Sequence, residues 1–114
     1  MKFNQWEIVY IKFPFTDLTN YKLRPALIIS NNNYNKKDNL ILIWIFWNEW
    51  LKDFSLILDD EDLESWKMLK QSFFRFQNIF SLDKSLVERK IWKLKIEKLK
   101  NIIKIFKDYI DIDL

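Results

Sequence analysis

The sequence predicts a small, mainly β domain of the barrel type that ends in a C-terminal helix. Five or six short runs of β-branched, aromatic and other apolar residues, separated by polar turns, occupy most of the chain. The last part carries apolar residues at helical spacing. A length of 114 residues suits one domain. We therefore expect a single domain over residues 1–114, with the barrel over about residues 5–94 and the helix over about residues 95–110.

The predicted strands follow from the pattern of apolar residues. The first strand, over residues 6–13, ends at Pro14, which has no N–H to donate to a neighbouring strand. The run over residues 40–46 is apolar on both faces, which is typical of a central strand. Shorter strands are predicted over residues 26–29, 54–58, 72–76 and 87–94.

The remaining segments predict a turn and two helices. Residues 59–68 predict a short helix that Asp60 caps, because its carboxylate can accept a free N–H of the first turn. Residues 81–85 predict a turn. A longer helix is predicted from Ile96 onward, and its apolar stripe consists of Leu99, Ile102, Ile103, Phe106 and Ile110.

The chain contains no Gly, no His and no Cys, and these absences exclude several classes of site. Glycine-rich loops that cradle the phosphates of nucleotides need a backbone without Cβ atoms. Zinc sites built from His and Cys, thiol nucleophiles and Ser-His triads are excluded as well. Because Asn tolerates left-handed backbone conformations, we expect the turns, including the polar loop over residues 31–39, to use Asn and Asp in place of Gly.

The charge balance is mildly basic, with 19 Lys and Arg against 16 Asp and Glu and a net charge of +3. This balance permits nucleic-acid binding without requiring it. The longest apolar run, residues 40–47, is much shorter than the roughly 18 residues of a membrane-spanning helix, and no signal-peptide pattern opens the chain. We expect a cytoplasmic protein with no membrane partner.

Two long motifs resemble the PemK/MazF family of toxin–antitoxin ribonucleases. The first consists of Phe13 to Leu18 (FPFTDL) followed by Leu23 to Ser30 (LRPALIIS), and the second runs from Arg75 to Ile91 (RFQNIFSLDKSLVERKI). The resemblance implies an SH3-like barrel of the plasmid-maintenance toxin type (PemK/MazF/CcdB-like) that forms a homodimer. It also implies metal-independent cleavage of single-stranded mRNA without a cofactor, and an antitoxin protein as partner.

In that family the ribose 2′-hydroxyl attacks its own phosphate, so the site needs a base, a cation for the phosphorane and an acid. Arg suits the cationic role because its planar fork holds two phosphate oxygens and keeps its charge. Arg24 and Arg75 stand where the resemblance places the phosphate-binding arginines. The alternative is that Arg24 is a surface residue at a loop end and that Arg75 forms an ion pair on a strand.

Two positions depart from the family pattern, with Phe46 in place of a Thr and Gln77 in place of an acid. Gln cannot take a proton, and the loss of a positioned base costs about 10²–10⁴-fold in rate. Asp17 is the first candidate for a substitute, followed by Thr16 in the same loop and by Glu7. Asp17 can equally be an Asx-turn residue. A second hypothesis is therefore a catalytically degenerate member that acts by binding an antitoxin or RNA.

The aromatic and basic residues have two interpretations each. The rings of Trp44, Phe46, Trp47 and Trp50 can stack on bases, with Trp47 as the candidate RNA contact, but a core or partner surface is favoured for the group. A basic run that includes Lys84 and Arg89 can contact phosphates or form a solvated edge.

Two Trp residues stand at or beside positions where the resembled family has Gly. These residues are Trp6 and Trp92. Each must fill a gap, cover an interface or occupy the groove.

Overall fold

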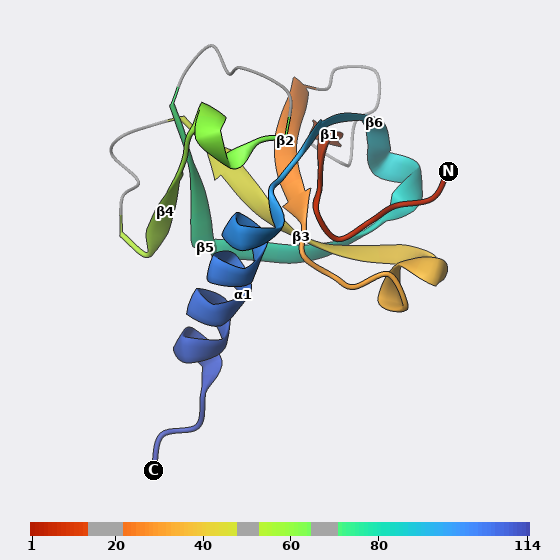
Figure 1. The fold of residues 1–114 in the computed structure, drawn as a ribbon. Helices are drawn as coiled ribbons and strands as arrows, with labels where there is room; N and C mark the ends of the chain where they lie inside the picture. Colours follow the sequence, from red (N-terminus) through yellow and green to blue (C-terminus); the bar gives the residue numbers. More distant parts are fainter. Residues whose placement is uncertain (14–21, 48–52, 65–70) are drawn as a thin grey trace.

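The computed structural model describes residues 1–13, 22–47, 53–64 and 71–114. Six antiparallel strands form one strongly curved sheet in the order β4-β5-β3-β2-β1-β6, and a helix follows the last strand (Figure 1). This arrangement confirms the predicted mainly β fold with a C-terminal helix. The elements are β1 (Glu7–Phe13), β2 (Lys22–Ile28), η1 (Tyr34–Lys36), β3 (Asn39–Phe46), β4 (Ser55–Leu58), η2 (Asp60–Asp62), β5 (Ser72–Asp83), η3 (Lys84–Leu86), β6 (Val87–Lys93) and α1 (Ile96–Ile110).

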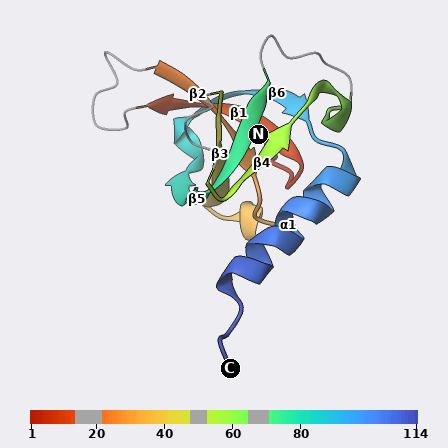
Figure 2. The ribbon, with the colours of Figure 1, turned by 90° about the vertical axis from the view of Figure 1, so that its left-hand side faces the viewer.

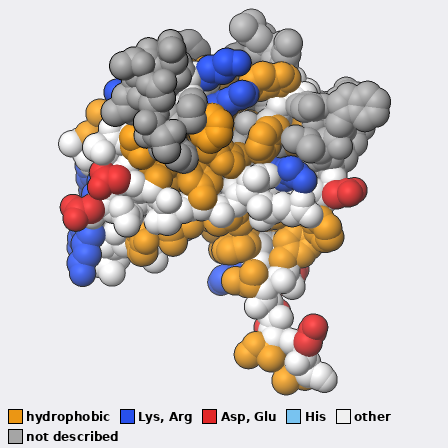
Figure 3. Space-filling model, turned by 180° about the vertical axis from the view of Figure 1, so that it is seen from behind, with side chains coloured by type: hydrophobic (Ala, Val, Ile, Leu, Met, Phe, Trp, Pro, Cys, Tyr) orange, Lys and Arg blue, Asp and Glu red, His pale blue; other side chains and the backbone are white. Residues whose placement is uncertain are grey.

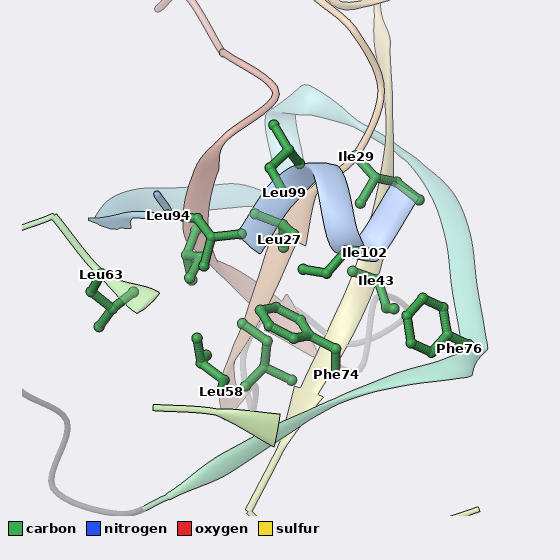
Figure 4. Packing of buried hydrophobic residues seen from close by; sticks show 12 residues of the cluster. Leu27, Ile29, Ile43, Leu58, Leu63, Phe74, Phe76, Leu94, Leu99 and Ile102 are labelled. Atoms are coloured by element: carbon green, nitrogen blue, oxygen red, sulfur yellow. The ribbon is translucent and has the colours of Figure 1, made fainter. Parts of the chain in front are cut away.

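Both faces of the sheet are apolar, so the strands in its middle are buried on two sides. The face that α1 covers carries a cluster that includes Leu27, Ile43, Phe74, Leu99 and Ile102 (Figure 4). Residues next to these along the strands point the other way and form a second cluster. Its buried members are Phe3, Val9, Ile11, Ala26, Ile28, Leu40, Leu42 and Leu82. Burial of each large apolar side chain contributes about 1.5–3 kcal/mol, so both clusters stabilise the sheet.

Helix α1 lies across the sheet with its first half and extends beyond it with its second (Figures 1 and 2). Of the predicted stripe, Leu99 and Ile102 are buried and Ile103 and Phe106 are half-buried. Ile110 is 64% exposed because it lies past the edge of the sheet. No helix in the part of the chain that the structure describes is long and apolar enough to cross a membrane.

Strand β2 begins at Lys22, four residues before the predicted start, and includes Pro25. The prediction was wrong because Pro usually interrupts a strand. Strand β3 pairs with β2 only from Ala26 onward, whereas β1 pairs with it from Lys22. Pro25 therefore occupies an edge-like position, where a missing N–H is tolerated.

Strand β5 continues to Asp83, so the turn predicted over residues 81–85 was also placed too early. Ser81 and Asp83 lie on the exposed side of a strand whose intervening Leu82 is buried. Polar residues on one side of a half-buried strand resemble a turn in the sequence, which is why the prediction failed here. The chain turns in η3, where the N–H of Ser85 donates to the Asp83 carboxylate at 2.8 Å.

The short helix predicted after Asp60 is the single turn η2, and the residue that precedes it is Asp59. The N–H of Asp59 donates to Asp62 Oδ2 at 2.8 Å, so a carboxylate closes the turn from its third position. Asp60 is therefore not the cap. Residues 65–68 of that prediction lie outside the described residues.

Among the described residues, the one with a positive φ is Phe54 (φ 55°), and not an Asn or Asp. The N–H of Phe76 donates to the carbonyl of Phe54 at 2.9 Å, and the ring of Phe54 meets that of Tyr109 edge-to-face at 5.4 Å. In the loop over residues 31–39 the Asn side chains act as hydrogen-bonding groups instead. Asn35, which is buried, donates to the carbonyl of Ser30 at 2.9 Å.

Candidate functional site

Arg24 and Arg75 lie on the same face of the sheet, on the two strands that flank β3. Along β2, Arg24 alternates with Ala26, which belongs to the cluster on the face away from α1. On β5, Arg75 follows Phe74, whose side chain lies in the cluster under α1, so Arg75 faces the opposite side. Two strand spacings separate β2 from β5, which is about 10 Å between backbones. Both guanidinium groups can therefore reach one ligand.

The register between β3 and β5 changes beside Arg75. Ile43 pairs with Ile79 and Ile45 with Phe74, so Trp44 alone stands opposite four residues, 75–78, of β5. This wide bulge leaves two polar atoms buried without a hydrogen-bond partner, Arg75 Nε and Asn78 Oδ1. Bulges of this kind re-aim side chains beside binding sites. The bulge thus presents a free donor and a free acceptor.

Gln77 holds the Arg75 guanidinium. Arg75 Nη2 donates to Gln77 Oε1 at 2.6 Å. None of the ion pairs in the described ranges involves Arg75; they join Lys12 to Glu88, Lys90 to Glu7 and Lys98 to Asp62. Because an amide carries no charge, the positive charge of Arg75 is not neutralised by the group that orients it.

Arg24 stands over the ring of Trp47, with its Cζ 5.6 Å from the ring centroid. It lies within β2 opposite Ile11 and not at a loop end. Trp47 is 49% exposed, so its ring offers a free face next to the arginine. A guanidinium over an indole keeps its full charge for a further ligand.

Trp44, another described residue of the patch, packs against aromatic residues outside the patch. Trp44 stacks on Phe80 at 4.4 Å and meets Phe13 edge-to-face at 5.7 Å. Trp44 and Phe80 also pack against the cluster on the face away from α1. For Trp44 this agrees with the core role that the sequence favours for the aromatic patch. The space-filling view from behind shows hydrophobic side chains gathered across the middle of the molecule, with basic side chains at their margin (Figure 3).

The structure does not bring Glu7 to the arginines, so this substitute base was wrong. Glu7 is buried, pairs with Lys90 at 3.0 Å and accepts the N–H of Asn4 at 2.6 Å. It stands four residues along β1 from Ile11, the partner of Arg24, which is about 13 Å. Thr16, Asp17 and Trp50 lie outside the described residues.

Phe46 offers no hydroxyl at the position of the expected Thr, and its strand partner is Phe73. No pattern in the sequence singles out Asn78, although it directly follows Gln77 in the second motif. The signal that reveals it is the bulge, which depends on the pairing of strands distant in sequence. Trp6 and Trp92 both pack against the cluster under α1, so each fills space in the fold.

The predicted basic contacts Lys84 and Arg89 lie apart from the two arginines. Arg89 is on β6, with its Cζ 5.0 Å from the ring centroid of Tyr10. Lys84 is in η3, beyond the end of β5 that pairs with Asn39. Within the described ranges no group of three or more acidic side chains is placed to hold a metal ion.

The chain matches the family model described as "PemK-like, MazF-like toxin of type II toxin-antitoxin system" over residues 4–110. No curated protein sequence matches it.

Several solved structures share the fold at low sequence identity. One is MazE-MazF from Deinococcus radiodurans, with a TM-score of 0.76, 16% identity and 99% of each chain covered. An endoribonuclease in complex with its cognate antitoxin from a mycobacterial species has a TM-score of 0.74 and 11% identity, with 99% of this chain and 97% of that chain covered. The Mycobacterium tuberculosis toxin MazF-mt6 has a TM-score of 0.71 and 15% identity, with 95% and 99% covered.

Proposed function

The chain belongs to the PemK-like, MazF-like toxin family of type II toxin–antitoxin systems, and from this membership we propose that it is an endoribonuclease that cleaves single-stranded mRNA. The observation that carries the proposal is the placement of Arg24 and Arg75 on one face of the sheet, on either side of β3. Neither arginine has an ion-pair partner among the described residues. Both positive charges are therefore available to a phosphate.

The proposed reaction is a phosphoryl transfer within the RNA, without a metal or cofactor. The 2′-hydroxyl loses its proton and attacks the adjacent phosphorus, and the bond from phosphorus to the 5′-oxygen breaks. The products are a 2′,3′-cyclic phosphate and a 5′-hydroxyl, which takes up a proton. Arg24 and Arg75 stabilise the negative charge that develops on the phosphorane.

The proton transfers need groups beyond the two arginines, because Gln77 and Phe46 can neither accept nor donate a proton in this reaction. We assign the base to Asp17 and place Thr16 beside the scissile phosphate, as the resemblance of their loop to the family motif implies. Trp47 is the proposed stacking surface for a base, which contributes about 1–3 kcal/mol. Lys84 and Arg89 are proposed contacts to the backbone of the RNA.

We also propose that the protein acts in the cytoplasm as a homodimer and is neutralised by an antitoxin. Relatives of the same fold have been solved with their antitoxins, which supports this choice of partner. The charges of the two half-buried arginines would attract acidic side chains of such a partner as well as phosphates.

Cleavage of a long single-stranded RNA in the presence of EDTA tests the proposal. We expect cleavage by the wild type and a loss of about 10²–10³-fold in Arg24→Gln and Arg75→Gln, because each removes a charge from the phosphorane. The matched control is Lys100→Gln, which removes one charge from the exposed side of α1. RNA that stays intact at high protein concentration, while an active relative cleaves it under the same conditions, would refute the proposed nuclease activity.

A second candidate function is that of a degenerate member that acts by binding its antitoxin. The bond from Arg75 to the neutral Gln77 favours it, because no carboxylate is present at that position. This candidate predicts tight binding of the antitoxin peptide in calorimetry together with no cleavage. Cleavage without peptide binding would exclude it.

A further inference from the structure

A second basic site lies at the opposite end of β3 and β5 from the two arginines. Lys2, Lys36 and Lys84 come from the N-terminal segment, η1 and η3, and they line one cavity of about 320 Å³. The other lining residues are Met1, Phe3, Asn32 and Asn35. Three separate segments of the chain therefore bring their lysines to one place.

The cavity has no acidic lining residue among those that the structure describes. The acidic residues near the cavity lie outside its lining. Glu7 pairs with Lys90, Asp38 accepts the N–H of Lys84 at its carbonyl, and the Asp83 carboxylate accepts the N–H of Ser85 and interacts electrostatically with Lys84. None of the ion pairs in the described part of the chain involves Lys2, Lys36 or Lys84. Three like charges around one hollow repel one another and attract an anion.

The amide side chains beside these lysines are already held by the fold. Asn35 Nδ2 donates to the carbonyl of Ser30, and Asn32 Oδ1 accepts the N–H of Gln5 at 3.1 Å. The N–H of Lys84 donates to the carbonyl of Asp38 at 2.9 Å, which fixes η3 against the loop that follows η1. The backbone under Lys84 is thus positioned before a ligand arrives, and its ammonium group provides charge without a rigid geometry.

We propose that this lysine cavity is a second phosphate-binding site, which holds the backbone of single-stranded RNA at a distance from the cleaved bond. The inference rests on the proposed ribonuclease function. Asn39 pairs with Asp83 at the lysine end of β3, and Phe46 pairs with Phe73 at the arginine end. Seven residues separate these ends, which is about 23 Å. Only an RNA that extends well beyond the scissile phosphate reaches both sites.

The test is the salt dependence of RNA binding, measured by fluorescence anisotropy from about 50 to 200 mM salt. The probes are 2′-O-methyl oligoribonucleotides, which lack the attacking hydroxyl, of about 4 and about 16 nucleotides. The variant combines Lys36→Gln and Lys84→Gln. The matched control combines Lys100→Gln and Lys104→Gln, two exposed lysines of α1, and carries the same change in net charge.

We expect the double variant to reduce the slope of log K against log salt by about 1.4 with the long probe, since each single-strand phosphate contact contributes about 0.7. Its slope with the short probe should match that of the wild type, and the control should change neither. Equal changes in this slope for the double variant and the control would overturn the inference. Equal changes in the slope for the long and the short probe would overturn it as well. Loss of binding to polyglutamate with unchanged RNA binding would also overturn it, because the site would then serve an acidic protein.

These outcomes are separate from the test of the nuclease. A wild type that cleaves no RNA refutes the proposed function, whereas the change in slope is measured on probes that cannot be cleaved. If a thermal melt shows that the double variant does not fold, the single variant Lys36→Gln replaces it, with an expected change in slope of about 0.7 for the long probe.

Discussion

Replacing Gln77 by Glu tests whether this position limits catalysis. The amide oxygen of Gln77 is 2.6 Å from Arg75 Nη2, so the introduced carboxylate can form the same contact without moving the backbone. Coulomb's law gives about 1.6 kcal/mol for unit charges at this distance in bulk water. Gln77 is exposed, and exposed ion pairs contribute only about 0.2–1 kcal/mol after screening and loss of side-chain freedom. The pKa of the introduced carboxyl should thus fall only slightly below the ordinary value of about 4.3.

At neutral pH the introduced carboxylate is therefore ionised and can accept the proton of the 2′-hydroxyl. Because Asp17 is the proposed base, the test uses an Asp17→Asn background, in which we expect Gln77→Glu to raise the single-turnover cleavage rate by at least about 10²-fold and to add an acidic limb near pH 4 to the pH–rate profile. The matched control in the same background is Gln77→Ala, which removes the contact with Arg75 and supplies no base. A rate that Gln77→Glu leaves unchanged or lowers in this background, with normal RNA binding, would refute the reasoning, because a carboxylate at position 77 would then not act as a base.

Three further predictions concern stability. Phe74→Ala should lower the free energy of unfolding by about 3–5 kcal/mol in urea titrations, because Phe74 is fully buried beneath α1; a loss below about 1 kcal/mol would contradict this packing. Phe54→Gly should be at least about 1 kcal/mol more stable than Phe54→Ala, because both remove the ring but only Gly adopts φ 55° without steric cost; equal stabilities would contradict it. Hydrogen bonds from the backbone N–H and the side chain of Ser85 lower the pKa of Asp83, so its contribution to stability is present above the unfolded pKa and is lost as the pH falls through the lower folded value. The Tm advantage of the wild type over Asp83→Asn should accordingly be full at neutral pH and vanish in acid.

Local patterns predicted the elements of this fold well, whereas their ends depended on partners distant in sequence. The apolar run of β3 and the stripe of α1 follow from periodicity that the sequence shows directly. The start of β2 at Lys22 depends on pairing with β1 beyond Pro25, which no local signal indicates. The extension of β5 to Asp83 depends in the same way on β3.

For the candidate site too, local motifs identify some residues, whereas others depend on contacts between strands distant in sequence. Arg24 and Arg75 were found from motifs, but their common face follows from the alternation and order of the strands. The acidic side chain of Glu7 makes it a candidate base in the sequence, but in the structure its carboxylate is buried with Lys90. Asn78 was missed because the bulge is a property of two strands and not of one. The left-handed residue could not be predicted either, since Phe ordinarily disfavours this conformation and is held there by Phe76 and Tyr109.

The bulge over residues 75–78 also bears on how the family can diversify. On both sides of the bulge, β5 keeps its regular pairing with β3. Residues from Ile79 to Asp83 pair with β3 on one side, and Phe73 and Phe74 pair with it on the other. The residues between are thus released from the β3 register that constrains the rest of β5. A substitution at Gln77 or Asn78 alters the chemistry presented beside Arg75 without shifting the pairing of β5 with β3. The fold can in this way tolerate the exchange of an acid for an amide, so catalytic rate and stability can evolve separately.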